Sequence, residues 1–373
     1  MLIKTRKSRG PFGLLGAILA VIFVESMFAR HDLDLSRPEN MGWRWGRSAA
    51  RREAPKADIL GFGTSMMQAG FLPREIAART GRPTYSMAVV SSQMPYSYYI
   101  FKHAIDSGAK PSAVIIDFPV NFLGTALDSQ SASWPDALSV ADTLDMAWNL
   151  GDARFFAAVL SEKWLPSLAY RLQIRKAVLA ALRGESASLR ADNLAYTRNH
   201  NRNLGATVTG KNASYNGEIT PFYRDVFLSD HWRADPIKAR YFRRLIKLAA
   251  ANDAKVYWLI TPFAPELQAG RDEKNLDALY NEFARVMTSN FPNLTVLDAR
   301  HSGYGVKTFR DAIHLDIDGA SALSHAVADV LNDDAQSSSW VRLPQFRARP
   351  IDAPVELLSE SINAVRSGMG LRR

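Results

Sequence analysis

Residues 58–65 read Asp-Ile-Leu-Gly-Phe-Gly-Thr-Ser, a short apolar run that ends in Gly63, Thr64 and Ser65. Apolar runs without strict alternation are typical of a strand that is covered on both faces, as in a parallel sheet. A serine that follows such a strand and begins a helical pattern lies on a tight turn at the carboxyl end of the strand, where sites of parallel sheets collect. Serine is also a common helix N-cap, so Ser65 by itself indicates a candidate site and no more.

The same kind of run recurs along the chain, and helical patterns follow. The strand candidates are Asp58–Phe62, Tyr85–Val90, Ala113–Phe118, Lys255–Thr261 and Leu294–Asp298. The helix candidates are Pro73–Thr80, Pro95–Ser107, Asp235–Ala251, Glu273–Asn290 and Gly319–Leu331. Strands that alternate with helices favour parallel crossovers, so the order predicts an α/β fold with a doubly wound, flavodoxin-like sheet over residues 57–334.

A long insertion separates the third and fourth predicted strands. We place it at residues 142–234, since a plain crossover needs far fewer residues. Residues 142–183 have helical periodicity, whereas residues 193–232 are rich in Asn, Gly, Tyr and Arg and predict an ordered loop region that overhangs the site. Residues 335–373 form a C-terminal extension.

The extension carries one helical pattern. Val355, Leu358, Ile362 and Val365 mark one face of a short helix. We expect this helix to pack on its own domain, and a partner-docking helix is the alternative.

The amino-terminal segment has the features of a membrane anchor. Four basic residues precede the apolar run from Phe12 to Val24, which continues past Glu25 to Phe28. By the positive-inside rule, residues 1–31 predict a cytoplasmic start and a transmembrane helix in the cytoplasmic membrane, with the rest exported to the periplasmic side. A cleaved signal peptide is the rival interpretation, because the uninterrupted run is short. Residues 32–56 are polar and irregular around Trp43-Arg44-Trp45 and predict a stalk.

Composition excludes several classes of protein. The formal net charge is +9, of which +3 lies in residues 1–29 and +3 in residues 335–373, so the body is nearly balanced. A body without a basic stripe argues against nucleic-acid binding. The sequence contains no cysteine, which excludes disulfides, thiolate nucleophiles and cysteine metal sites.

Polar residues at the ends of other strands complete a candidate site. The third strand runs into Phe-Pro-Val-Asn, and the amide of Asn121 could donate to an oxyanion, although Asn also stabilises turns. After the last strand comes Asp311-Ala312-Ile313-His314. Asp and His three residues apart can form a hydrogen bond while the far imidazole nitrogen faces a serine across the strand ends.

These blocks resemble the SGNH, or GDSL-like, hydrolase superfamily, over roughly residues 57–125 and 235–333. That family has a Gly-Asp-Ser block after the first strand, a Gly after the second, an Asn after the third and Asp-x-x-His before the last helix, on a flavodoxin-like fold. The resemblance implies Ser65 as nucleophile, His314 as general base and Asp311 as the residue that orients it. It also implies an oxyanion hole formed by Ser65, Ser91 and Asn121. Two positions depart from the family, since Thr64 replaces the Asp and Ser91 replaces the Gly.

Other residues have alternative roles. Tyr215, Tyr223, His231 and Trp232 of the insertion are candidate substrate contacts, because flat rings with polar edges suit carbohydrate, although His231 could instead cap or pack. His103 and His325 fall within helical patterns, where we expect structural roles. No cluster has metal-ligand spacing, and neither a metal nor another cofactor is expected.

Two hypotheses follow. The first is a serine-dependent acyl-ester hydrolase or O-acyltransferase that acts on an exported polysaccharide or cell-envelope glycan. Its expected partners are an acylated glycan or acyl donor, the membrane, and proteins of envelope polysaccharide modification. The second is a non-catalytic module of the same fold that binds a glycan or supports an envelope assembly.

Overall fold

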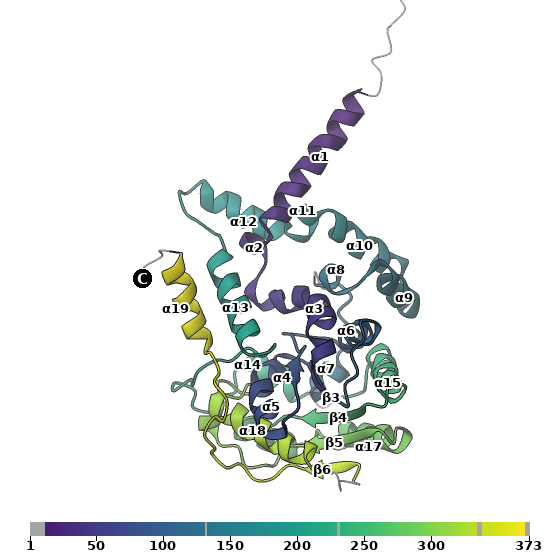
Figure 1. Cartoon of the computed structure of the whole chain (residues 1–373), viewed down its shortest axis with the longest axis vertical. Coiled ribbons are helices and arrows are strands. Elements are labelled where there is room, and N and C mark those ends of the chain that lie inside the picture. Colours follow the sequence, from purple (N-terminus) through teal and green to yellow (C-terminus); the bar gives the residue numbers. More distant parts are fainter. Residues whose placement is uncertain (1–11, 131–132, 230–231, 334–337, 370–373) are drawn as a thin grey trace, which may run out of the picture.

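A six-stranded parallel sheet forms the centre of the protein (Figure 1). The computed structural model describes residues 12–130, 133–229, 232–333 and 338–369. The strand order is β2-β1-β3-β4-β5-β6, and every neighbouring pair is parallel. The strands are β1 Ile59–Gly63, β2 Thr84–Ser86, β3 Ala113–Asp117, β4 Lys255–Ile260, β5 Leu294–Asp298 and β6 Trp340–Arg342. The predicted α/β class and parallel sheet are confirmed, and the order of the first five strands is the flavodoxin-like one.

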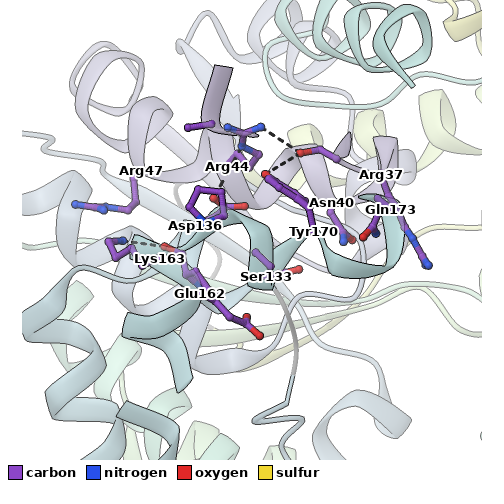
Figure 2. A pocket seen from close by; sticks show the side chains of 15 residues that line it. Arg37, Asn40, Arg44, Arg47, Ser133, Asp136, Glu162, Lys163, Tyr170 and Gln173 are labelled. Atoms are coloured by element: carbon purple, nitrogen blue, oxygen red, sulfur yellow. Dashed lines mark hydrogen bonds and ion pairs between the residues drawn. The ribbon is translucent and has the colours of Figure 1, made fainter. Parts of the chain in front are cut away.

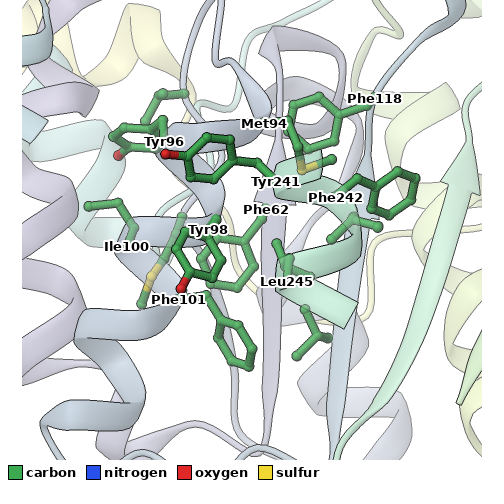
Figure 3. Close-up of a cluster of buried hydrophobic side chains, with 14 of the residues drawn as sticks. Phe62, Met94, Tyr96, Tyr98, Ile100, Phe101, Phe118, Tyr241, Phe242 and Leu245 are labelled. Atoms are coloured by element: carbon green, nitrogen blue, oxygen red, sulfur yellow. The ribbon is translucent and has the colours of Figure 1, made fainter. Parts of the chain in front are cut away.

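Both faces of the central strands β1 and β3 are buried, which explains why these strands are mostly apolar. In β1, Leu60 and Phe62 belong to one core cluster, whereas Ile59 belongs to the other. Alternate residues of a strand point to opposite faces, so each face needs its own helices. Figure 3 shows the first core, where aromatic side chains of α6 (Met94–Asp106) and α15 (Pro236–Ala250) pack against Phe62 and Phe118.

The helices around the sheet agree with most of the sequence predictions. The first face is covered by α6, α15 and α17 (Ala278–Asn290), and the second by α4 (Ser65–Gly70), α5 (Pro73–Thr80) and α18 (Ile317–Leu331). The helix expected over Glu273–Asn290 is wrong at its start. The chain forms α16 at Pro265–Glu273, breaks, and resumes at Ala278, because Asn275 takes a left-handed φ of 49°.

The insertion is more helical than expected. Its helices, with those that flank it, are α7 Val120–Gly124, α8 Trp134–Ala137, α9 Val140–Leu150, α10 Ala153–Trp164, α11 Pro166–Ala169, α12 Arg171–Ala181, α13 Arg190–Arg202 and α14 Pro221–Phe227. The helical prediction for residues 142–183 is confirmed. The loop prediction for residues 193–232 is wrong in part, because α13 and α14 lie within it, and residues 203–220 between them are mostly irregular.

The predicted stalk at residues 32–56 is wrong. This segment folds into α2 (Asp32–Leu35), η1 (Pro38–Asn40), α3 (Met41–Arg52) and η2 (Ala54–Lys56). Trp43 of α3 is only 2% exposed, and its ring centroid lies 4.5 Å from that of Tyr96. Its Nε1 donates a hydrogen bond to the Val90 carbonyl at 3.0 Å. Gly46 permits this approach, because a Cβ there would collide with the Tyr96 hydroxyl. The apolar residues of α3 occur at helical spacing, although basic residues between them make the segment polar on average.

The C-terminal extension contributes to the domain. Residues 340–342 form β6 beside β5, a strand too short to be recognised in the sequence. The helix α19 (Leu358–Gly368) packs on α13, with Val355, Leu358, Ile362 and Val365 partly buried. Its predicted packing on its own chain is confirmed.

The amino-terminal helix α1 (Phe12–Arg30) projects away from the body (Figure 1). The window Gly13–Arg30 has a mean hydropathy of 1.8 and no residue buried within the protein. The helix is therefore long and apolar enough to cross a membrane.

We predict that Trp43→Ala lowers the free energy of unfolding by about 3–5 kcal/mol, the usual loss for a buried aromatic residue truncated to Ala. Trp148→Ala is the matched control, because Trp148 is 86% exposed and should change little. Urea titration of the full chain in one detergent measures both. Equal stability of the two variants would mean that α3 contributes no packing to the body.

Candidate active site

The turn after β1 places Ser65 at the edge of the sheet. Gly63 ends β1 beside Asp117 of β3, where a Cβ would lie 2.7 Å from the Asp117 carbonyl oxygen, so only glycine fits. Thr64 is the N-cap of α4 and accepts a hydrogen bond from the Met66 N–H at 3.3 Å. Thr64 therefore takes the capping role, and the half-buried Ser65 hydroxyl is left for other contacts.

The loop between β5 and α18 presents Asp311 and His314 to this turn. An antiparallel bridge joins Phe309 to Leu315, and the Arg310 N–H donates to the His314 carbonyl at 2.8 Å. Asp316 closes the loop by capping α18 at the Asp318 and Gly319 N–H groups. The loop is thus fixed at both ends.

The structure brings the three residues together in one hydrogen-bonded chain. Ser65 Oγ lies 2.8 Å from His314 Nε2, and His314 Nδ1 lies 2.8 Å from Asp311 Oδ2. The serine and the histidine are 249 residues apart in sequence. This is the arrangement in which an imidazole can accept the serine proton while a carboxylate orients the ring.

Asp311 is held in its ionised form. Burial acts to raise its pKa, but the hydrogen bond and charge of His314 and the N–H groups of Ile313 and His314 outweigh it, so the pKa lies below the ordinary value. The two backbone N–H groups donate to Oδ1 at 3.0 and 2.9 Å. The carboxylate therefore stays charged and fixed in position beside the imidazole.

A second carboxyl group beneath the serine turn was not identified from the sequence. Asp117 at the end of β3 is buried, and the Thr64 hydroxyl donates to it at 3.4 Å. Burial raises the pKa of Asp117 to about 8, although hydrogen bonds from Thr64, the Met67 N–H and Thr261 act in the opposite direction. In the sequence Asp117 is a single carboxyl group within the apolar run Ala113–Phe118, and only the pairing of β3 with β1 places it below Thr64.

The two other expected oxyanion residues lie at the same edge of the sheet. Ser91 is exposed on the turn after β2 and has a left-handed φ of 54°, a conformation that glycine adopts readily. Asn121 is on α7, directly after β3, and its Oδ1 is buried without a hydrogen-bond partner among the described residues. Within those residues, no hydrogen bond joins Ser91 or Asn121 to Ser65, His314 or Asp311.

The insertion reaches the loop between β5 and α18 through two of the predicted substrate contacts. Burial first, then the charge of Asp311 and a hydrogen bond to it, raise the pKa of Tyr223. Burial and the charges of Glu266 and Asp311 raise the pKa of Tyr215 to about 12, and its buried hydroxyl has no hydrogen-bond partner among the described residues. Asn212 Nδ2 donates to the Arg310 carbonyl at 2.8 Å, which ties the segment to the loop. Both tyrosines are therefore close to the candidate site.

Of the two other expected substrate contacts, Trp232 and His231, the structure describes only Trp232. Trp232 donates through Nε1 to the Val120 carbonyl at 2.6 Å and packs edge-on against Tyr280 at 5.5 Å, so it supports α7. It also lines a small cavity of about 80 Å³ together with Asn121. His231 lies outside the described residues.

A larger cavity of about 310 Å³ opens beside Ser91. Trp43 of α3 and Phe122, the neighbour of Asn121, line it, as does Lys238 of α15. Lys238 Nζ donates to the Phe122 carbonyl at 2.7 Å, and burial lowers its pKa to about 8. The cavity therefore lies next to Ser91, one of the expected oxyanion residues.

The remaining histidines form contacts within the fold. His103 Nε2 lies 2.8 Å from Asp142 Oδ2, and Asp142 forms the capping box of α9 with the N-cap Ser139. The buried His325 Nε2 lies 2.9 Å from Glu75 Oε2. Glu75, His325 and Asp352 form a group whose geometry could hold a cation, which the sequence did not suggest because Glu75 and His325 are 250 residues apart. Glu75 already accepts the N–H groups of Asp352 and Ala353 at 2.9 and 2.7 Å, so the group fastens the C-terminal segment to α5 and α18.

We predict that Asp117→Asn removes a pH dependence of stability. Burial raises the pKa of Asp117 to about 8 in the folded protein, whereas an exposed aspartate of the unfolded chain has the ordinary pKa of 3.8. Stability from this group is therefore full at low pH and declines as pH rises between these two values.

Urea midpoints of the wild type and Asp117→Asn at pH 5 and pH 8 measure this effect. The wild type should lose more stability than the variant on going to pH 8. Parallel losses would show that Asp117 is already ionised in the folded protein.

The sequence was also compared with known proteins. No family model matches it, and no curated protein matches it either. The chemistry of the site therefore has to be inferred from the geometry of its residues.

Proposed function

We propose that this protein is a serine-dependent acyl-ester hydrolase or O-acyltransferase of the SGNH type. The observation that carries the proposal is the continuous hydrogen-bonded chain from Ser65 through His314 to Asp311. Structural serines cap helices or bond to nearby backbone, whereas here Thr64 caps α4 and Ser65 bonds to a histidine from the far end of the chain.

The geometry supports a two-step acyl transfer. His314 Nε2 accepts the Ser65 proton as Oγ attacks the ester carbonyl, and the histidine then returns this proton to the leaving alkoxide. The ester bond breaks and a Ser65 acyl ester forms. In the second step His314 removes a proton from water or from a sugar hydroxyl, whose oxygen attacks the acyl carbonyl. The ester bond to Ser65 breaks, and His314 returns the proton to Ser65 Oγ. Asp311 holds the imidazole in the required tautomer throughout.

The arrangement around the chain also supports the resemblance to the SGNH superfamily. Ser65 follows β1, Asn121 follows β3, and Asp311 and His314 precede the last helix on the sheet. The left-handed φ at Ser91 suits the position where that family has glycine. Where the family has Asp before the serine, Thr64 instead contacts the buried carboxyl group of Asp117.

An exported glycan is the substrate class that we propose. Tyr215 and Tyr223 lie near Asp311, and a flat ring with a hydroxyl group suits a sugar face. The helix α1 is suited to anchor the domain, and we place the basic N-terminus in the cytoplasm and the site on the periplasmic side. Contact between Glu25 of α1 and Ser167 of α11, at 2.9 Å to the N–H group, favours a retained helix over a cleaved signal.

A non-catalytic module is the second candidate. It is favoured by Thr64 and Ser91, because both depart from the family pattern in the neighbourhood of the expected oxyanion hole. A fluorophosphonate probe separates the two functions, because it reacts with an activated serine and not with an ordinary hydroxyl group.

We predict that the probe labels the full-length wild type and that Ser65→Ala abolishes labelling. Ser65→Ala and His314→Ala should also lower aryl-acetate turnover by roughly 10³-fold or more, since each removes a member of the proton-transfer chain. Ser107→Ala and His301→Ala are matched controls at exposed positions. Labelling of Ser65→Ala at the wild-type rate would reject Ser65 as nucleophile and leave the binding module.

We predict that Asn121→Ala raises the activation barrier by about 2–4 kcal/mol without loss of the fold, as expected for one oxyanion donor. The readout is kcat/KM for an aryl acetate, beside thermal unfolding of the same sample. Asn290→Ala, at an exposed helix end, is the control. Turnover equal to the control would make Asn121 a turn residue.

A further inference from the structure

Three consecutive helices of the insertion lie across the C-terminal end of α1 (Figure 1). These are α10, α11 and α12, which we call the platform. Glu25, near the end of α1, accepts hydrogen bonds from the N–H and the hydroxyl of Ser167 in α11. The platform is therefore attached to the apolar helix at the level where that helix joins the body.

The platform exposes large apolar side chains. Trp164 at the end of α10 is 68% exposed, and Leu182 just after α12 is 79% exposed. Leu168, Leu172, Val178 and Leu179 are exposed as well. In α12 no residue is buried, although apolar residues occur throughout it. A helix of 11 residues with no fully buried side chain is marginal in water, so a further surface would stabilise it.

Basic residues share the exposed face of α12. Arg171, Arg175 and Lys176 are exposed beside Leu172, Val178 and Leu179, and Arg183 follows the helix. The helix contains no acidic residue. Intermixed apolar and basic residues are typical of a helix that lies in a membrane interface, where long basic side chains reach the headgroups and their stems contact acyl chains.

A positively charged cavity lies below the platform. The cavity has a volume of about 360 Å³ and is lined mainly from α3, α8, α10 and α11. Figure 2 shows the side chains that line it. Four basic residues, Arg37, Arg44, Arg47 and Lys163, line it against two acidic ones, Asp136 and Glu162. Arg47 Nε is buried without a hydrogen-bond partner among the described residues. The excess of basic residues in the cavity adds to the positive potential at the C-terminal end of α1.

We propose that the platform is a lipid-binding surface that rests on the membrane crossed by α1 and binds its anionic headgroups. The apolar side chains enter the acyl-chain boundary, and the basic residues of α12 and the cavity bind phosphate groups. This proposal rests on α1 as an anchor and is independent of the chemistry of Ser65. Binding of the platform to lipid holds the body at a fixed orientation to the membrane, which a single flexible tether could not do.

Continuity with α1 favours lipid over a protein partner. The hydrogen bond between Glu25 of α1 and Ser167 of α11 holds the platform next to α1. An apolar surface next to a membrane-spanning helix meets the same bilayer. The charge of α12 complements anionic lipid, whereas a second copy of the chain would bring like charges together.

Spin labels on single cysteines test the proposal in the full chain, which contains no cysteine of its own. The variants are Leu179→Cys and Leu182→Cys, with Ile18→Cys in α1 as the lipid-exposed control and Lys274→Cys as the water-exposed control. Each is reconstituted into vesicles of phosphatidylcholine with phosphatidylglycerol, and the collision rates of the label with oxygen and with a water-soluble nickel chelate are measured.

We predict that labels at 179 and 182 collide preferentially with oxygen, as the label at 18 does, whereas the label at 274 collides preferentially with nickel. Nickel-dominated collisions at 179 and 182 would place the platform in water and overturn the proposal. Protection from both reagents would show a protein partner instead, which also overturns it.

The role of charge has a test of its own. In vesicles of phosphatidylcholine alone, the oxygen preference at 179 should fall, and Arg175→Gln with Lys176→Gln should produce the same fall in the mixed vesicles. Arg224→Gln with Arg243→Gln removes two charges outside the platform and should leave the preference unchanged. An equal preference in both lipids would overturn the binding of anionic headgroups.

Discussion

The close pairing of β1 with β3 is the constraint on which the candidate site depends. Gly63 lies opposite Asp117, and no side chain fits between this residue and the Asp117 backbone. The two strands therefore end together, with the serine turn directly above the buried carboxyl group of Asp117. Because parallel strands end at one edge, the turns after β1, β2 and β3 place Ser65, Ser91 and Asn121 on the same side of the molecule.

Across this edge, the loop before α18 completes the site. A bridge between Phe309 and Leu315 and the cap at Asp316 hold the backbone of the loop, and the hydrogen bond from His314 Nδ1 to Asp311 orients the imidazole ring. The insertion packs on the same loop, since Asn212 bonds to Arg310 and Tyr223 faces Asp311. The proposed nucleophile and base are thus held by the sheet, while the proposed substrate contacts come from the insertion.

The segment between α1 and the sheet links the membrane side to the site. Trp43 of α3 bonds to the Val90 carbonyl, one residue before Ser91, and lines the cavity beside it. The other side of α3 lines the basic cavity below the platform. One buried helix therefore separates the proposed lipid surface from the proposed oxyanion region.

Much of this protein was determined locally by its sequence. Apolar runs and helical spacing predicted the parallel sheet, most of its helices and the apolar amino-terminal helix, because these depend on residues near one another in the chain. The pairing of Ser65 with His314 was anticipated only through the residues that follow strands. The buried α3, the strand β6, Asp117 beneath Thr64 and the Glu75, His325 and Asp352 group were not anticipated. Each of these features results from contacts between segments that are distant in the sequence. Burial in the tertiary structure decides whether a segment rich in polar residues packs in the core. Burial also decides whether a carboxyl group retains its proton.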